Sequence, residues 1–399
     1  MVARAVYAFN WYNIGAVLPL IGPSLRADAA ELGIVLGAFL VGVGIFQVPA
    51  GFAAMRWGSR RISLIGIAVM GMAGTLSGFA PSWEWLAGIR FVAGVGAAFF
   101  FSPALSLVSS YFPPGPRGTV IGLYNGGFSI GGAAGLGVGA LVGATYGWPA
   151  ALVGGGIALL LTTLVAWALL PRQSAEESTS DLHRILQRSR AILRSRSLWA
   201  LSFGLLGFWS AVYIVAQYFV EYVAAVHATW GLATAALMAA LVVVVSFPGG
   251  PVGGWLSERG GDRRLLLMTT TVLSGCLVLS IPFAPFLVLW PILAALGFLD
   301  GMGFAVLYVI PSYLTEMQGE GLALGLAVVN SIQVLCGGGL AVAFGFIVAG
   351  YGFMTAWLYA GALAILFVPL VLAVSPSRAR HRGQREELRP ALDAPLDGS

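Results

Sequence analysis

The chain has 399 residues, of which 58% are hydrophobic and only 9% are charged, and its formal net charge is +5. Soluble domains carry about 25% charged residues, so this composition excludes an ordinary soluble enzyme. It also excludes a disordered chain, which needs high charge and low hydrophobicity. Because the basic residues fall between apolar segments, the positive charge favours a membrane protein over a nucleic-acid-binding one.

Apolar segments long enough to cross a bilayer recur along the whole chain, since a hydrocarbon core of about 30 Å takes roughly 20 residues as a helix. We predict an all-α membrane protein with twelve transmembrane helices near 5–22, 32–54, 62–80, 85–112, 118–143, 149–170, 198–222, 231–253, 265–282, 286–314, 321–347 and 355–374. Asn10 and Asn13 interrupt the first segment and no small-residue cleavage site follows it, so we expect a helix and not a signal peptide.

The arginines predict the orientation of these helices in the membrane. Of the 21 basic residues, 19 fall on the side that holds both termini, with Arg4 and Arg56 among them. Arg26 falls on the opposite side, and Arg90 lies inside the fourth segment. Positive charge concentrates on the cytoplasmic side. We therefore expect a multi-pass protein of the cytoplasmic (inner) membrane with both termini in the cytoplasm.

The two halves of the chain share landmarks at a nearly constant offset. Residues 51–61 and 254–264 correspond, Gly118 corresponds to Gly321, and Tyr-Gly-Trp at 146–148 corresponds to Tyr-Gly-Phe at 351–353. A duplication explains these matches. We expect a six-helix bundle at 1–170, a cytoplasmic linker at 171–197, a second six-helix bundle at 198–374 and a disordered cytoplasmic tail at 375–399.

These landmarks carry a resemblance to a known family. The loops at 51–61 and 254–264 match Gly-x-Leu-Ala-Asp-Arg-x-Gly-Arg-Arg in spacing, and Arg90, Gly94 and Gly96 fit Arg-x-x-x-Gly-x-Gly. Over about 1–374 the chain resembles the major facilitator superfamily, and 111–127 distantly resembles the nitrate/nitrite and cyanate-type carriers. The resemblance implies two pseudo-symmetric six-helix bundles that move a small solute by alternating access without a cofactor.

The two matched loops predict a gate at the cytoplasmic face. Glycines at 51 and 254 allow helices to approach closely, and an acid beside arginines can latch the face. The second loop keeps the acid, whereas Met55 replaces it in the first. The alternative is that the arginines only set topology. The gate candidates are Gly51, Arg56, Gly58, Gly254, Glu258 and Arg259.

Ionisable residues at membrane depth are costly and are therefore candidates for function. Asp300 falls near the middle of the tenth segment, where a carboxyl can carry a proton, and we assign it to proton coupling together with Arg90. The alternative for Asp300 is a neutral carboxyl bonded to backbone in a glycine-rich kink. The alternative for Arg90 is helix packing.

Polar residues fall on one face of several segments, which is typical of a cavity lining. Trp209, Tyr213, Gln217 and Glu221, for example, follow one another at intervals of four residues. The alternative is interhelical hydrogen bonding. The candidates for the substrate cavity are Asn10, Asn13, Asn125, Trp209, Tyr213, Gln217, Asn330 and Gln333.

Three functions compete at this point. The first is secondary transport of a small solute, by proton symport or facilitated uptake. The second is proton-driven efflux of drugs or lipophilic cations, which the absence of a Gly-Pro signature in the fifth segment disfavours. The third is a membrane enzyme or sensor, disfavoured because the sequence shows no cluster of His, Asp and Glu residues with metal-ligand spacing. We expect a monomer in the lipid bilayer with a small-molecule substrate and protons as partners, and no metal or nucleic acid.

Overall fold

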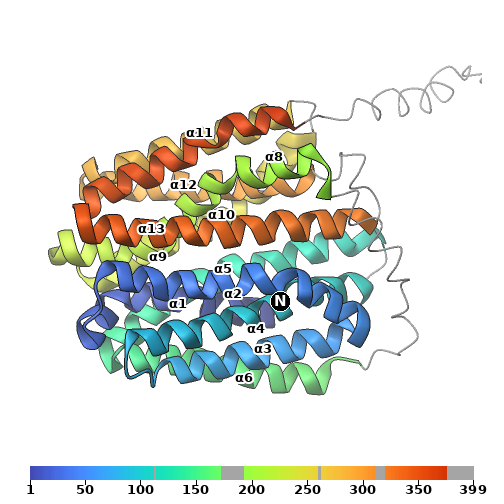
Figure 1. Cartoon of the computed structure of the whole chain (residues 1–399), viewed down its shortest axis with the longest axis horizontal. Helices are drawn as coiled ribbons and strands as arrows, with labels where there is room; N and C mark the ends of the chain where they lie inside the picture. Colours follow the sequence, from blue (N-terminus) through green and yellow to red (C-terminus); the bar gives the residue numbers. More distant parts are fainter. Residues whose placement is uncertain (112–113, 172–192, 259–261, 311–319, 375–399) are drawn as a thin grey trace, which may run out of the picture.

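The computed structural model of the chain describes residues 1–111, 114–171, 193–258, 262–310 and 320–374. In these ranges every regular element is a helix, and the long helices run side by side (Figure 1). The helices of the N-terminal half are α1 (Val2–Leu25), α2 (Ala29–Trp57), α3 (Ser59–Ser77), α4 (Trp83–Tyr111), α5 (Pro114–Tyr146) and α6 (Trp148–Leu169).

The C-terminal half repeats this series of spans, but short breaks and 3-10 helices interrupt it. Its seventh span consists of α8 (Arg196–Gly204) and α9 (Leu206–Val226), which meet at Leu205. The next three spans are α10 (Leu232–Glu258), α11 (Arg263–Ser280) and α12 (Phe286–Val309). The short 3-10 helix η2 (Ala228–Trp230) lies between α9 and α10, and η3 (Ile281–Phe283) lies between α11 and α12. The described part of the C-terminal half ends with α13 (Glu320–Leu366), which is broken at Gly352, and η6 (Val368–Ala373).

The described helices account for the twelve predicted spans. Nine helical stretches are long and apolar enough to cross a bilayer, and one of these has 47 residues because it joins the eleventh and twelfth spans across Gly352. The two remaining spans are α1 and α3, which lie alongside the others (Figure 1). Prolines interrupt several spans, for example Pro49 in α2 and Pro103 in α4. A proline leaves a backbone carbonyl without its helical partner, and neighbouring helices can satisfy such groups inside a membrane.

Packing repeats between the halves in the same order as the sequence. Helix α2 packs on α4 as α10 packs on α12, and α3 packs on α6 as α11 packs on the part of α13 after Gly352. The turns before the sixth and twelfth spans are also alike, because Gly147 has φ 85° and Gly352 has φ 79°. Only glycine adopts this conformation readily. The prediction of two pseudo-symmetric six-helix bundles is confirmed, while the residue boundaries of the bundles stay a prediction.

The two bundles meet along a surface that we call the seam, where α1 packs on α9, α2 on α13 and α5 on α10. The seam is tight at the end away from the arginine-rich loops. There, a Cβ added at Gly345 would come 2.5 Å from the Ala29 carbonyl oxygen, and one added at Gly33 would come 3.2 Å from the Val342 carbonyl oxygen. Helices α2 and α13 therefore make backbone-to-backbone contact at this end.

Candidate functional site

Arg90 is a buried cation on α4 at the centre of the N-terminal bundle. Its side chain is 2% exposed, and its Cζ lies 4.5 Å from the centroid of the Phe39 ring on α2. One guanidinium nitrogen donates to the Asn10 carbonyl on α1 at 3.5 Å. The Nε and Nη2 atoms find no hydrogen-bond partner among the described residues. An unpaired buried charge is expensive, so a ligand or water is needed to satisfy this group.

Arg4 is a second buried cation. Its assignment to the cytoplasmic side stays a prediction, and the structure shows that its side chain is shielded from solvent. Helix α1 begins at Val2, and its first turn packs against Gly127 of α5, so Arg4 lies inside the bundle with 6% exposure. Aromatic rings surround the Arg4 Cζ at 4.4–5.6 Å; they belong to Tyr7, Phe101, Tyr124 and Phe128. Cation–π contacts compensate part of the lost hydration.

The C-terminal bundle contributes a stacked aromatic pair to the seam. Trp209 and Tyr213 on α9 stack with ring centroids 5.3 Å apart and an interplanar angle of 7°. Both rings are buried, and the Tyr213 hydroxyl has no partner in the part of the chain that is described. Tyr213 lies within electrostatic range of Arg90 across the seam. The predicted face of the seventh span thus meets the predicted arginine of the fourth.

Asp300 on α12 lies at the same central level. It is 9% exposed, and its Oδ1 has no hydrogen-bond partner among the residues that the structure describes. Tyr12 on α1 lies within electrostatic range of Asp300, Tyr213 and Arg4. The backbone bond that the sequence analysis offered as an alternative for Asp300 is not formed at Oδ1.

Two buried glutamines lie on α2 and α13, the helices that pack together across the seam. Gln333 on α13, which the sequence predicted, and Gln47 on α2, which it missed, are each 1% exposed. Both carry amide atoms without a partner in the described ranges. Nearby, the Ser331 hydroxyl donates to the Gly44 carbonyl and ties the two helices together. A lone glutamine in an otherwise apolar span was the signal that could have found Gln47.

Three predicted cavity residues instead make helix-to-helix bonds. The Asn10 amide donates to the Val6 and Gly155 carbonyls at 2.9 and 2.8 Å, and the Asn13 amide donates to Ala151 at 3.4 Å. The bonds to Gly155 and Ala151 hold α1 to α6 within one bundle, while the bond to Val6 lies within α1. The Gln217 amide crosses the seam and donates to the Trp11 carbonyl at 3.2 Å. For the two asparagines the alternative of interhelical bonding fits the geometry.

Several predicted residues are only partly placed. Asn330 is half-buried on α13. Arg259 and the side chains of Asn125 and Glu258 lie outside what the structure describes. The acid-to-arginine latch expected in the second loop therefore stays a prediction.

The predicted role of Gly51 and Gly254 in close helix approach is wrong for this conformation. A Cβ added at either glycine would meet nothing within 4 Å, whereas one added at the neighbouring Gly253 would come 2.6 Å from the Met302 backbone. The close approach of α10 to α12 is therefore at Gly253 and not at Gly254. Gly58 instead has a conformational role, since its φ of 85° joins α2 to α3. Arg56 is exposed and lies over the ring of Trp57, with its Cζ 5.5 Å from the centroid.

Arginines near the start of α3 and α11 bond to carbonyls at the end of the last helix of each bundle. Arg60 donates to the Leu170 carbonyl at 3.1 Å and to the Trp167 carbonyl at 2.7 Å. Arg264 donates to the Val374 carbonyl at 3.1 Å and pairs with Asp262 at 3.3 Å. The side-chain hydrogen bond from Arg264 lowers the pKa of Asp262 below its ordinary value. These arginines satisfy carbonyls that a helix end leaves open.

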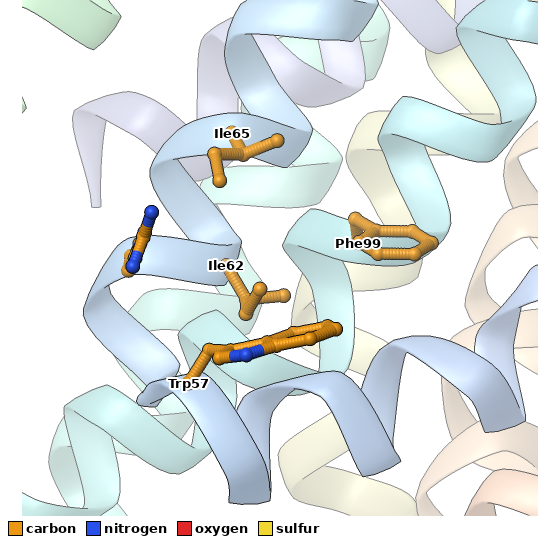
Figure 2. Close-up of a pocket in the computed structure, with 5 residues that line it drawn as sticks. Trp57, Ile62, Ile65 and Phe99 are labelled. Carbon is orange, nitrogen blue, oxygen red and sulfur yellow. The ribbon is translucent and has the colours of Figure 1, made fainter.

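A surface hollow of about 250 Å³ lies near this arginine-rich end (Figure 2). Trp57 of α2, Ile62 and Ile65 of α3 and Phe99 of α4 line it together with Arg61. All five residues belong to the N-terminal bundle. The hollow therefore lacks the contribution from both bundles that an alternating-access site needs.

The comparisons agree with this architecture. The family model described as Major Facilitator Superfamily matches residues 1–335. The chain belongs to this superfamily. It is a secondary transporter of small solutes and not an enzyme. The likeness extends to the fold of the E. coli xylose transporter in its inward-open conformation, with a TM-score of 0.72 at 15% identity over 97% of this chain and 98% of that one.

Two curated relatives span nearly the whole chain. A probable sulfoacetate transporter from Cupriavidus necator is 27% identical over 91% of this chain and 91% of its own length. The cis,cis-muconate transport protein from Acinetobacter baylyi is 24% identical over 89% of this chain and 91% of its own length. A superfamily member of this kind is a multi-pass membrane protein that moves a small molecule. In the described part of the chain, no group of three metal-binding side chains gathers.

Proposed function

We propose that this chain imports a small organic anion, a carboxylate or a sulfonate, together with protons. The observation that carries the proposal is Arg90, a buried guanidinium with two unsatisfied nitrogens. Its planar donors match a carboxylate or sulfonate in geometry and charge. A bound anion would satisfy a group that the described residues leave unpaired.

The position of Arg90 supports a role in transport. It contacts α1 through the Asn10 carbonyl and lies within electrostatic range of Tyr213 on the other bundle. Transporters of this architecture bind substrate between the bundles, near the middle of the membrane. An anion on Arg90 would therefore contact both bundles and could respond to their relative rotation.

The substrate class draws on the relatives. The two proteins that match nearly the whole chain are named for sulfoacetate and cis,cis-muconate, which are both organic anions. We favour this class over the nitrate/nitrite and cyanate-type likeness of the sequence. The second and eighth spans contain no arginine at membrane depth. These spans therefore offer no positive charge that would bind a small inorganic anion.

Asp300 supplies the proposed coupling to protons. It is the buried acid of α12, and Tyr12 links it electrostatically to Tyr213 and Arg4. When Asp300 is protonated its side chain is neutral, so it does not repel the anion that enters the site. Release of the proton on the cytoplasmic side then repels the anion and favours its release. This order predicts symport with uptake.

Uptake into proteoliposomes tests the proposal. Purified protein is reconstituted, an inside-alkaline pH gradient is imposed, and accumulation of radiolabelled sulfoacetate and muconate is measured. We expect accumulation of at least one of these anions, which collapses with a protonophore and disappears in Arg90→Gln. Arg61→Gln, an exposed arginine, is the matched control and should transport normally. Protein that extrudes lipophilic cations and ignores both anions would support the efflux alternative and overturn the proposal.

A further inference from the structure

The N-terminal bundle holds two buried guanidiniums at different levels along α1, since Arg4 belongs to the first turn of this helix. Arg4 and Arg90 each keep two guanidinium nitrogens without a partner in the part of the chain described. Arg90 contacts α1 at the carbonyl of Asn10. This carbonyl is six residues beyond Arg4, or about 9 Å along a helix. The protein therefore presents two separate places for negative charge.

A continuous set of aromatic rings connects these two places, and we call it the aromatic ladder. The Arg4 Cζ lies 4.9 Å from the ring of Tyr7, and the Arg90 Cζ lies 4.5 Å from the ring of Phe39. Trp11 lies between these rings, with centroids 5.7 Å from Tyr7 and 4.7 Å from Phe39. These rings offer mainly apolar contact, and the Tyr7 hydroxyl accepts a hydrogen bond from the Arg4 side chain, which leaves Nε and Nη1 of Arg4 and Nε and Nη2 of Arg90 without a partner among the described residues.

The charges of this region do not balance by themselves. Tyr12 on α1 lies within electrostatic range of one carboxyl, Asp300, and also of Arg4. One carboxylate neutralises at most one of the two guanidiniums. A proton on Asp300 leaves both of them uncompensated, and an unpaired buried charge is costly. A substrate with two negative charges would then balance the site together with the proton.

We propose that the site takes a two-headed anion, with one head on Arg90, the other on Arg4 and an apolar body along the aromatic ladder. Linear dicarboxylates have this chemistry. The inference rests on the proposed function, because it specifies the substrate class of the same site. It makes Arg4 the residue that distinguishes a dianion from a monoanion of equal length.

Binding of matched acids to the purified full-length protein tests the inference. Adipate and hexanoate have the same number of carbon atoms but carry two charges and one charge at pH 7.5. Dissociation constants are measured by calorimetry, with succinate and suberate to vary the length. We expect the wild type to bind adipate at least tenfold more tightly than hexanoate. In Arg4→Gln this preference should fall to near one while hexanoate binding is kept, whereas Arg90→Gln should weaken binding of both acids.

The outcomes separate the inference from the proposed function. Wild-type protein that binds hexanoate as tightly as each dicarboxylate overturns the two-headed substrate but leaves anion transport standing, and it does so without any variant. An Arg4→Gln protein that keeps the preference also overturns it. Arg4→Lys, which keeps a positive charge, should recover part of the preference and controls for packing against the four rings. A wild type that binds no organic anion contradicts the proposed function itself.

Discussion

Arg90 lies over the ring of Phe39, with its Cζ 4.5 Å from the ring centroid, and neither residue is exposed to more than 2%. The contact explains how α4 can hold a guanidinium at membrane depth without an acidic neighbour. Cation–π attraction in a desolvated place is worth about 2 kcal/mol, which is less than the cost of burying the charge. This deficit is the reason why we propose that Arg90 binds an anion.

Asp300→Asn is the variant that tests coupling. Asparagine keeps the size of the side chain but cannot carry a proton. We expect uptake driven by a pH gradient to be lost, while exchange of labelled for unlabelled anion across the membrane continues. Exchange needs only rotation of the bundles with substrate bound. An equal pH response in the variant and in the parent would contradict the role of Asp300.

Tyr213→Phe tests the contribution of the C-terminal bundle to binding. The variant should keep the stack on Trp209, whose ring centroid lies 5.3 Å away, and lose only the unpartnered hydroxyl. Loss of one hydrogen bond to the substrate costs about 0.5–1.5 kcal/mol, or roughly a factor of two to twelve in affinity. Calorimetry measures this change. Unchanged affinity would place the Tyr213 hydroxyl outside the site.

Gly345→Val tests the tight end of the seam. A side chain there would collide with the Ala29 carbonyl, since even a Cβ would come within 2.5 Å. We expect this end to open, which labelling of a cysteine introduced at Val342 by a membrane-impermeant maleimide would report, in a background without native cysteines. Gly350→Val, on the same helix with nothing within 4 Å, is the control. Equal labelling in both variants would show that the contact does not hold this end closed.

Arg60→Gln tests the closure of the helix ends. The variant removes donors to the Leu170 and Trp167 carbonyls, and we expect the loss of about 1 kcal/mol of stability, seen as a lower melting temperature with little change in substrate affinity. Arg56→Gln is the control, because Arg56 is exposed beside Trp57. If the two variants melt alike, the bonds from Arg60 contribute nothing measurable.

The architecture could be predicted from the sequence because membrane spans and repeats produce local patterns of hydropathy and of short motifs. Hydropathy located the twelve spans, and Tyr146-Gly147-Trp148 with Tyr351-Gly352-Phe353 marked a repeated turn whose two glycines share a positive φ. Asp300 and Arg90 were found because charge is rare at membrane depth. Both are buried in the protein, as expected because exposing a charge to lipid is costly.

The facing of individual side chains was harder to predict, because it depends on which helix is the neighbour. Asn10 and Asn13 lie on a polar face of α1, but that face packs on α6. Arg4 was read as a topological charge, since an arginine near a segment end usually reaches water. Its burial depends on how α1 packs against Gly127 of α5, which no local pattern records.

Binding of organic anions to wild-type and Arg90→Gln protein tests the central claim most directly. Calorimetry with sulfoacetate, muconate and adipate should show binding to the wild type by at least one of the three. Hydrogen bonds to a charged group contribute about 1.5–3 kcal/mol, so the variant should bind that anion roughly 10–100-fold more weakly. Equal affinity in the two proteins, or a wild type that binds lipophilic cations and none of these anions, would contradict the account.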